Sequence, residues 1–167
     1  MEDKLKILAV DDNGVILATI EEELKELYDV ITVNSGARAL RYLSQEKPDL
    51  ILLDIQMALM DGIETLKEIR NIDNCSTIPV IMLSAKMERE TVIESSKLGI
   101  LDYVGKPFEP QDLRDRISRA LKRSGVLPVE DKELYEYVKK VHEELLAGNV
   151  KSASLKIDEI LSFKIDV

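Results

Sequence analysis

The chain has 167 residues, of which 45% are hydrophobic and 33% charged, and this favours one globular domain with a modest addition. Its 23 Lys and Arg against 32 Asp and Glu give a net charge of −9, which argues against nucleic acid as the main partner. The single cysteine, Cys75, excludes an internal disulfide and a cysteine-rich zinc site. No signal peptide and no apolar run of the roughly 20 residues needed to span a membrane is visible, so we expect a cytoplasmic protein.

Short apolar runs recur along the first two thirds of the chain. Most of them are rich in aliphatic and β-branched residues and lack polar alternation, which is typical of strands covered on both faces. The five runs are residues 7–10, 30–33, 50–53, 80–83 and 101–104, the last of which alternates more.

Amphipathic stretches separate and follow these runs. Their apolar residues recur every three or four positions, as on one face of a helix. The four clear stripes are Ile16, Ile20, Leu24 and Leu27; Ala37, Leu40 and Leu43; Ile63, Leu66 and Ile69; and Leu113, Ile117, Ala120 and Leu121. A thinner stripe, Val92 and Ser96, marks a helix over 88–98. Five strands alternating with five helices predict an α/β fold whose parallel sheet has helices on both faces.

The pattern changes near residue 124. Ser124-Gly125 is typical of a helix end, and two further amphipathic stretches follow, separated by Gly148-Asn149. We therefore predict a first domain at 1–123, a linker at 124–129 and a two-helix hairpin at 130–167. Residues 125–167 carry six Lys and nine acidic residues, so we expect no direct DNA binding, but an interaction or dimerisation module.

Polar side chains follow four of the apolar runs. Asp11 and Asp12, Asp54, Ser84 and Lys106 come at or just after their ends. The carboxyl ends of parallel strands meet at one edge, so these side chains should converge there. Clustered carboxylates repel one another unless a cation is present, and oxygen ligands suit Mg²⁺. A carboxylate beside Mg²⁺ and a lysine is equipped to form an aspartyl-phosphate.

These residues lie in stretches that resemble the CheY-like receiver domain of bacterial two-component response regulators. The resemblance covers about residues 4–123. The matching stretches are Ile7 to Asn13, Leu52 to Gly62, Ser84-Ala85 and Asp102 to Phe108. It implies a flavodoxin-like sheet with the strand order 2-1-3-4-5.

The resemblance also implies roles for individual residues. Asp54 would be the phosphoacceptor, and Asp12, Asp54 and the backbone carbonyl of Gln56 would bind Mg²⁺ directly, with Asp11 acting through water. Ser84 and Lys106 would bind the phosphoryl group, Tyr103 would be an aromatic switch, and the bond before Pro107 would be cis. Where the family usually has proline, this chain has Ala58, which should loosen the loop without removing a ligand.

The implied function is a phosphorylation-gated response regulator rather than an enzyme. It would accept phosphate from a sensor histidine kinase or phosphotransfer protein, act on an unidentified downstream protein, and could form a homodimer through the hairpin. One alternative is a phosphorelay intermediate that passes phosphate between Asp54 and His142. Another is a phosphatase of the haloacid-dehalogenase type, which places a second aspartate where this chain has Gln56.

Overall fold

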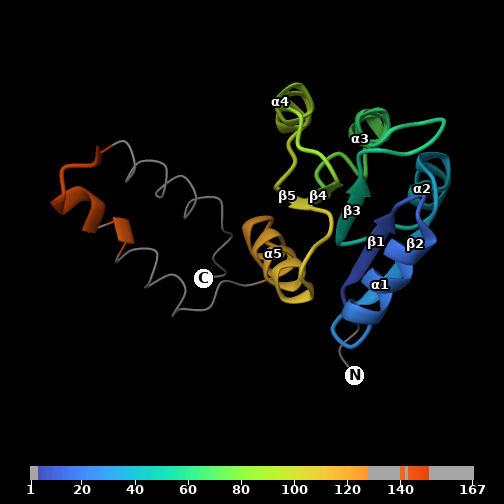
Figure 1. The fold of residues 1–167 in the computed structure, drawn as a ribbon, viewed down its shortest axis with the longest axis horizontal. Helices are drawn as coiled ribbons and strands as arrows, with labels where there is room; N and C mark the ends of the chain where they lie inside the picture. The colour runs from blue at the N-terminus through green and yellow to red at the C-terminus, as the bar shows by residue number, and fades with distance from the viewer. Residues whose placement is uncertain (1–3, 128–139, 142, 151–167) are drawn as a thin grey trace. The chain divides into compact units, whose positions relative to one another are not determined.

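The computed structural model describes residues 4–127, 140–141 and 143–150, and Figure 1 traces the chain through them. The chain divides into two compact units, Met1–Ile117 and Ser118–Val167. No helix within the described ranges is long and apolar enough to cross a membrane. The predicted linker at 124–129 lies partly outside the described residues. The predicted hairpin at 130–167 lies mostly outside them, and so does His142, so both elements remain predictions.

Strands and helices alternate along the first unit, as the sequence predicts. The strands are β1 (Lys6–Val10), β2 (Asp29–Val33), β3 (Leu50–Asp54), β4 (Val80–Ser84) and β5 (Asp102–Gly105). The helices are α1 (Gly14–Leu24), α2 (Gly36–Leu43), α3 (Gly62–Asn71), α4 (Arg89–Lys97) and α5 (Pro110–Arg123), the last of which crosses the boundary between the units.

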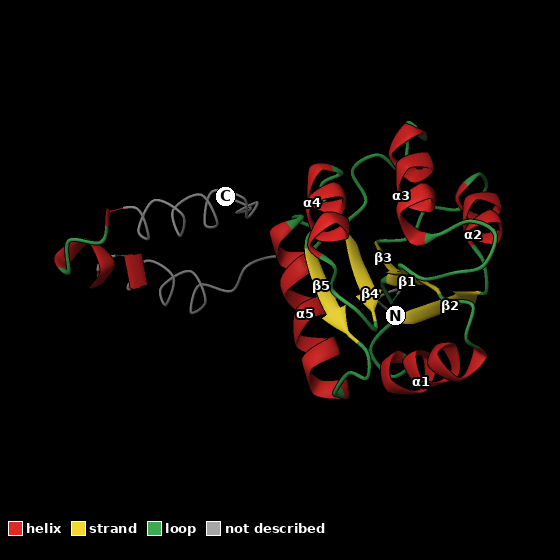
Figure 2. Cartoon of the chain, turned by 45° about the horizontal axis from the view of Figure 1, so that its top comes forward, coloured by secondary structure: helices red, strands yellow, loops and turns green. Residues whose placement is uncertain are grey.

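The five strands form one parallel sheet in the order β2-β1-β3-β4-β5, which confirms the flavodoxin-like order implied by the family resemblance. Figure 2 shows α2, α3 and α4 on one side of the sheet and α1 on the other. β3 and β4 are buried along their whole length, because helices cover both faces. Alternate strand residues such as Leu8, Ile51 and Met82 form a core with Leu43 and Leu66 of α2 and α3.

Several helix faces differ from the predicted stripes. Leu27 is 54% exposed, because α1 ends at Leu24 and the apolar periodicity continues beyond it. Leu17, which the stripe omits, is buried instead. In α2, Ala37 is exposed and Ala39 is buried.

Helix α4 is attached to the fold more weakly than its neighbours. Its N-cap, Glu88, makes no side-chain capping bond, and its one buried residue is Ser95 rather than the predicted Ser96. Burial of Ser95 is tolerated because its hydroxyl donates to the Thr91 carbonyl at 2.6 Å.

The carboxyl end of α4 is fixed by Arg70 of α3. The Arg70 guanidinium donates to the carbonyls of Leu98 at 2.8 Å and Gly99 at 3.2 Å. It also donates to the carbonyl of Ile78 at 2.8 Å. The arginine therefore replaces the missing intrahelical partners at the end of α4 with side-chain donors.

Candidate functional site

Asp54 ends the central strand and lies in the middle of the carboxyl edge of the sheet. β3 pairs with β1 on one side and β4 on the other, and Asp54 is in register with Leu83. The next residue, Ile55, donates its N–H to the Leu83 carbonyl at 3.0 Å, so the sheet pairing extends past the carboxylate. Asp54 is 3% exposed. The strand ladder thus holds a nearly buried carboxylate in a fixed place.

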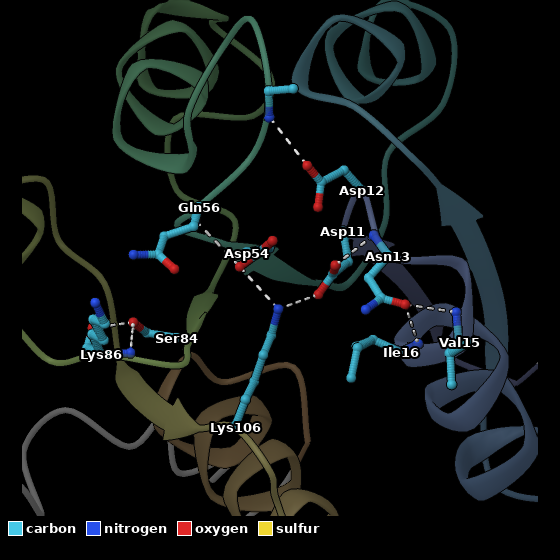
Figure 3. A network of polar contacts seen from close by, with 11 residues as sticks. Asp11, Asp12, Asn13, Val15, Ile16, Asp54, Gln56, Ser84, Lys86 and Lys106 are labelled. Carbon is cyan, nitrogen blue, oxygen red and sulfur yellow. Dashed lines mark hydrogen bonds and ion pairs between the residues drawn. The ribbon is translucent and has the colours of Figure 1, made fainter.

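Asp11 and Asp12 reach the same edge from β1 (Figure 3). Asp11 is fully buried, and its Oδ1 accepts the N–H of Asn13 at 2.9 Å. Asp12 is exposed, and its Oδ2 accepts the N–H of Ala58 at 3.1 Å. Carboxylate oxygens of Asp11, Asp12 and Asp54 lie within 4.8 Å of one another. The structure therefore brings together the three acidic residues that the sequence singled out.

Lys106 extends into this acidic cluster from the loop after β5. Its Nζ lies 2.5 Å from Asp11 Oδ2 and 2.9 Å from Asp54 Oδ1. Its backbone N–H donates to the Ser84 carbonyl at 2.7 Å, and the Lys106-Pro107 peptide bond is cis. The ammonium thus pairs with two carboxylates at once.

Burial and pairing shift the acid–base properties of this cluster in a coupled way. Desolvation raises the pKa of Asp54, although the hydrogen bond from Lys106 acts against this increase. For Lys106, desolvation acts to lower the pKa, but the hydrogen bonds to Asp11 and Asp54 raise it above its ordinary value. The Lys106 ammonium therefore stays charged at neutral pH. The raised pKa of Asp54 means that its surroundings favour the binding of a proton or another cation.

Ser84 ends β4 at the same edge, but its hydroxyl bonds to its own loop. Its hydroxyl donates to the carbonyl of Lys86 in the following loop and accepts the Lys86 N–H at 3.0 Å. Figure 3 shows the Ser84 and Lys86 pair apart from Asp54. In this arrangement the Ser84 hydroxyl is occupied by its own loop.

The Tyr103 side chain of β5 is bonded to helix α4. Its hydroxyl donates to the Thr91 carbonyl of α4 at 3.1 Å, and its ring packs against the core cluster beneath α3. Burial raises the pKa of the Tyr103 phenol, so it remains a neutral donor. The hydrogen bond connects β5 to the weakly attached helix.

The loop between β3 and α3 borders the acidic cluster. Gln56 donates its N–H to Asp54 Oδ1 at 3.3 Å. The N–H of Ala58, which a proline would lack, ties the loop to Asp12. The sequence predicts a looser loop at Ala58 and not this bond, although the departure from proline, which supplies a backbone N–H, is the signal that indicates it.

Comparisons with known proteins agree with this geometry. A family model described as the response regulator receiver domain matches residues 7–118. The chain is 39% identical over 122 residues to the alkaline phosphatase synthesis transcriptional regulatory protein PhoP of Bacillus subtilis, covering 72% of this chain and 50% of PhoP. It is also 39% identical over 117 residues to sporulation initiation phosphotransferase F of the same organism, covering 70% of this chain and 93% of the relative. The chain spans about half the length of several curated relatives that it matches.

Solved structures of receiver domains are also similar to this chain. The chemotaxis response regulator CheY4 of Vibrio cholerae superposes with a TM-score of 0.68 at 30% identity, over 70% of this chain and 98% of that one. The receiver domain of the Pseudomonas aeruginosa sensor histidine kinase PA1611, solved with a magnesium ion in its active site cleft, has a TM-score of 0.65 at 32% identity, over 71% and 98%. The chain therefore belongs to the response regulator receiver domain family, whose members accept a phosphoryl group in two-component signalling.

Proposed function

We propose that Asp54 accepts a phosphoryl group from the phosphohistidine of a sensor histidine kinase or phosphotransfer protein. The observation that carries this proposal is the cluster itself: a carboxylate at the end of the central strand, paired with Lys106 and adjacent to two further carboxylates. In the transfer the N–P bond breaks and its electron pair returns to the imidazole. A carboxylate oxygen of Asp54 forms the new O–P bond.

The two oxygens of Asp54 differ in their surroundings. Oδ1 accepts from Lys106 at 2.9 Å and from the Gln56 N–H at 3.3 Å. Among the hydrogen bonds of the described residues, none is accepted by Oδ2. Lys106 and Gln56 therefore orient the carboxylate, and Oδ2 is the oxygen that attacks phosphorus.

The donor set fits Mg²⁺. Three carboxylates and one ammonium sum to −2 in charge, and their oxygens lie within 4.8 Å of one another. Hard oxygen ligands with room for water are what Mg²⁺ prefers. Asp12, Asp54 and the backbone carbonyl of Gln56 would hold the ion, with Asp11 acting through water. When bound, the ion supplies positive charge that offsets the charge on the phosphoryl oxygens.

Phosphorylation would then alter the hydrogen bonds of Ser84 and Tyr103. A phosphoryl oxygen is a stronger acceptor than the Lys86 carbonyl, to which the Ser84 hydroxyl now donates. Hydrogen bonds to charged groups contribute about 1.5–3 kcal/mol each, so contacts from Ser84 and Lys106 total about 3–6 kcal/mol. Reversing a 1:99 population needs about 5.5 kcal/mol, so the two contacts suffice at the upper end of that range. Tyr103 would leave the Thr91 carbonyl as the switch proceeds.

The product of this reaction is a signalling state and not a released compound. We propose that the chain takes up phosphate stoichiometrically, acts in the cytoplasm through an unidentified protein target, and is not a turnover enzyme. The residue two positions after Asp54 supports this proposal. A haloacid-dehalogenase-type phosphatase has a second aspartate there, whereas this chain has Gln56.

The proposal is tested with acetyl phosphate and Mg²⁺, followed by intact-mass measurement. Wild type should gain one phosphoryl group, and Asp54→Asn should gain none. Asp49→Asn is the matched control, because Asp49 lies at the other end of β3, where it accepts the Lys6 N–H at 2.7 Å. Equal labelling of the Asp54→Asn protein, or labelling lost equally in the Asp49→Asn protein, would refute the assignment of Asp54.

A further inference from the structure

Leu59 combines two unfavourable features beside the acidic cluster. Its φ is 69°, and it is the one non-glycine residue with positive φ in the part of the chain that the structure describes. The left-handed region of φ and ψ is unfavourable for residues that carry a Cβ. An apolar leucine side chain makes no local hydrogen bond that would offset this cost. Leu59 is also fully exposed, with a relative accessibility of 107%. Its side chain therefore stabilises nothing within the fold.

The path of the chain requires a positive φ at position 59, but it does not require a leucine side chain there. On one side, Ala58 is tied to Asp12. On the other, Met60 donates its N–H to the Ala58 carbonyl at 2.8 Å, and its sulfur lies 3.0 Å from where a Cβ on Gly36 would stand. The chain must reverse at Leu59 for Met60 to pack inward and α3 to begin. Glycine would make this reversal without strain.

Two hydrogen bonds fix the loop that carries Leu59 at the edge of the acidic cluster, and this edge is the rim of the site. Gly62 donates its N–H to the Ile55 carbonyl at 2.8 Å, which closes the loop at its base. Its apex is fixed by the bond between Ala58 and the carboxylate of Asp12. A large apolar side chain is thus presented to solvent, one residue from a group that contacts the acidic cluster.

We infer that Leu59 is a recognition residue for the protein that donates the phosphoryl group, and this inference rests on the proposed function. Asp54 is 3% exposed, so a phosphohistidine on a folded partner reaches it only when the partner's surface lies against the rim. Leu59 then inserts into an apolar depression beside the donor histidine, where burial of its side chain favours the complex. A small phosphodonor enters the site without touching the rim.

The experiment compares two phosphodonors on the full-length chain. The protein donor is chosen from a panel of purified, autophosphorylated sensor histidine kinases as the one with the highest kcat/KM on wild type. The small donor is acetyl phosphate with Mg²⁺. Leu59→Ala removes the side chain, and Leu59→Gly removes it together with the strain. Leu27→Ala is the matched control, because Leu27 is also exposed but precedes β2, at the opposite edge of the sheet.

Both Leu59 variants should lose about tenfold in kcat/KM with the kinase, which is about 1.4 kcal/mol, and remain within about twofold of wild type with acetyl phosphate. Leu27→Ala should match wild type with both donors. Unchanged transfer from the kinase to Leu59→Ala would overturn the inference, as would an equal loss with both donors. If no kinase in the panel labels wild type while acetyl phosphate does, the inference fails and Asp54 stands as the acceptor. If neither donor labels it, the proposed function fails first.

Discussion

Gly62 offers a direct test of how α3 is joined to the phosphoacceptor strand. A Cβ at this position would lie 2.1 Å from the carbonyl oxygen of Asp54, 2.7 Å from Ile55 Cα and 2.9 Å from the carbonyl carbon of Asp54. All three atoms belong to the backbone, so no side-chain rotation relieves the overlap. In Gly62→Ala, either the start of α3 or the end of β3 must move.

The cost of this substitution follows from the contacts that it breaks. Overpacking of a dense interior costs about 1–3 kcal/mol, and a backbone overlap belongs at the upper end. Displacement also loses the Gly62 N–H bond to Ile55, which contributes about 1 kcal/mol. Alanine recovers about 1 kcal/mol through its higher helix propensity. We expect Gly62→Ala to lower the free energy of unfolding by about 3 kcal/mol.

Urea denaturation measures this difference, and Gly14→Ala is the matched control. Gly14 is the first residue of α1, and a Cβ there would have no atom within 4 Å. The control should be unchanged or slightly more stable. Gly62→Ala should also label more slowly with acetyl phosphate, because Asp54 shifts with the strand end. A Gly62→Ala protein as stable as the Gly14→Ala protein would refute the close approach of α3 to β3.

Three further substitutions test the cluster and the attachment of α4. Since the pKa of Asp54 is raised on folding, its contribution to stability is present below the unfolded carboxyl pKa and is lost as pH rises through the folded value. Without Mg²⁺, the stability of Asp54→Asn relative to wild type should therefore increase as pH rises from the unfolded carboxyl pKa to the folded one. A relative stability that decreases over this range would contradict the shift. Lys106→Met leaves Asp11 and Asp54 without their cation and should cost about 3–5 kcal/mol in chelator, with part recovered on adding Mg²⁺ in thermal melts. Arg70→Leu should cost about 2 kcal/mol in urea denaturation, because the carbonyls at the end of α4 lose their donors, whereas Arg41→Leu on an exposed face should not.

The strands and the convergence of the acidic residues could be predicted from the sequence. Runs such as 50–53 and 80–83 lie within one residue of β3 and β4, because strands buried on both faces are continuously apolar. Once the sheet is parallel, Asp11, Asp12 and Asp54 must meet at one edge. Topology alone fixes their proximity.

The helix faces and the loop hydrogen bonds could not be predicted in the same way. Apolar periodicity does not show where a helix ends, so the stripe predicted for α1 extends to Leu27 although the helix stops at Leu24. Nor does it identify a buried serine such as Ser95, whose hydroxyl is satisfied by its own helix. The bonds of Ala58 and Ser84 depend on the backbone path of two loops, which the pattern of residue types does not specify.

The unequal attachment of α4 has a mechanical consequence. Arg70 anchors one end of this rod through backbone carbonyls, and the other end, beside Glu88, has no side-chain cap. The Tyr103 hydroxyl holds the rod near its other end by donating to the Thr91 carbonyl. If that bond is released, the rod is held most firmly at Arg70 and swings about that point like a lever. The uncapped end adjoins the loop in which Lys86 binds Ser84, so a displacement of that loop would turn the helix and change the direction of its outer surface.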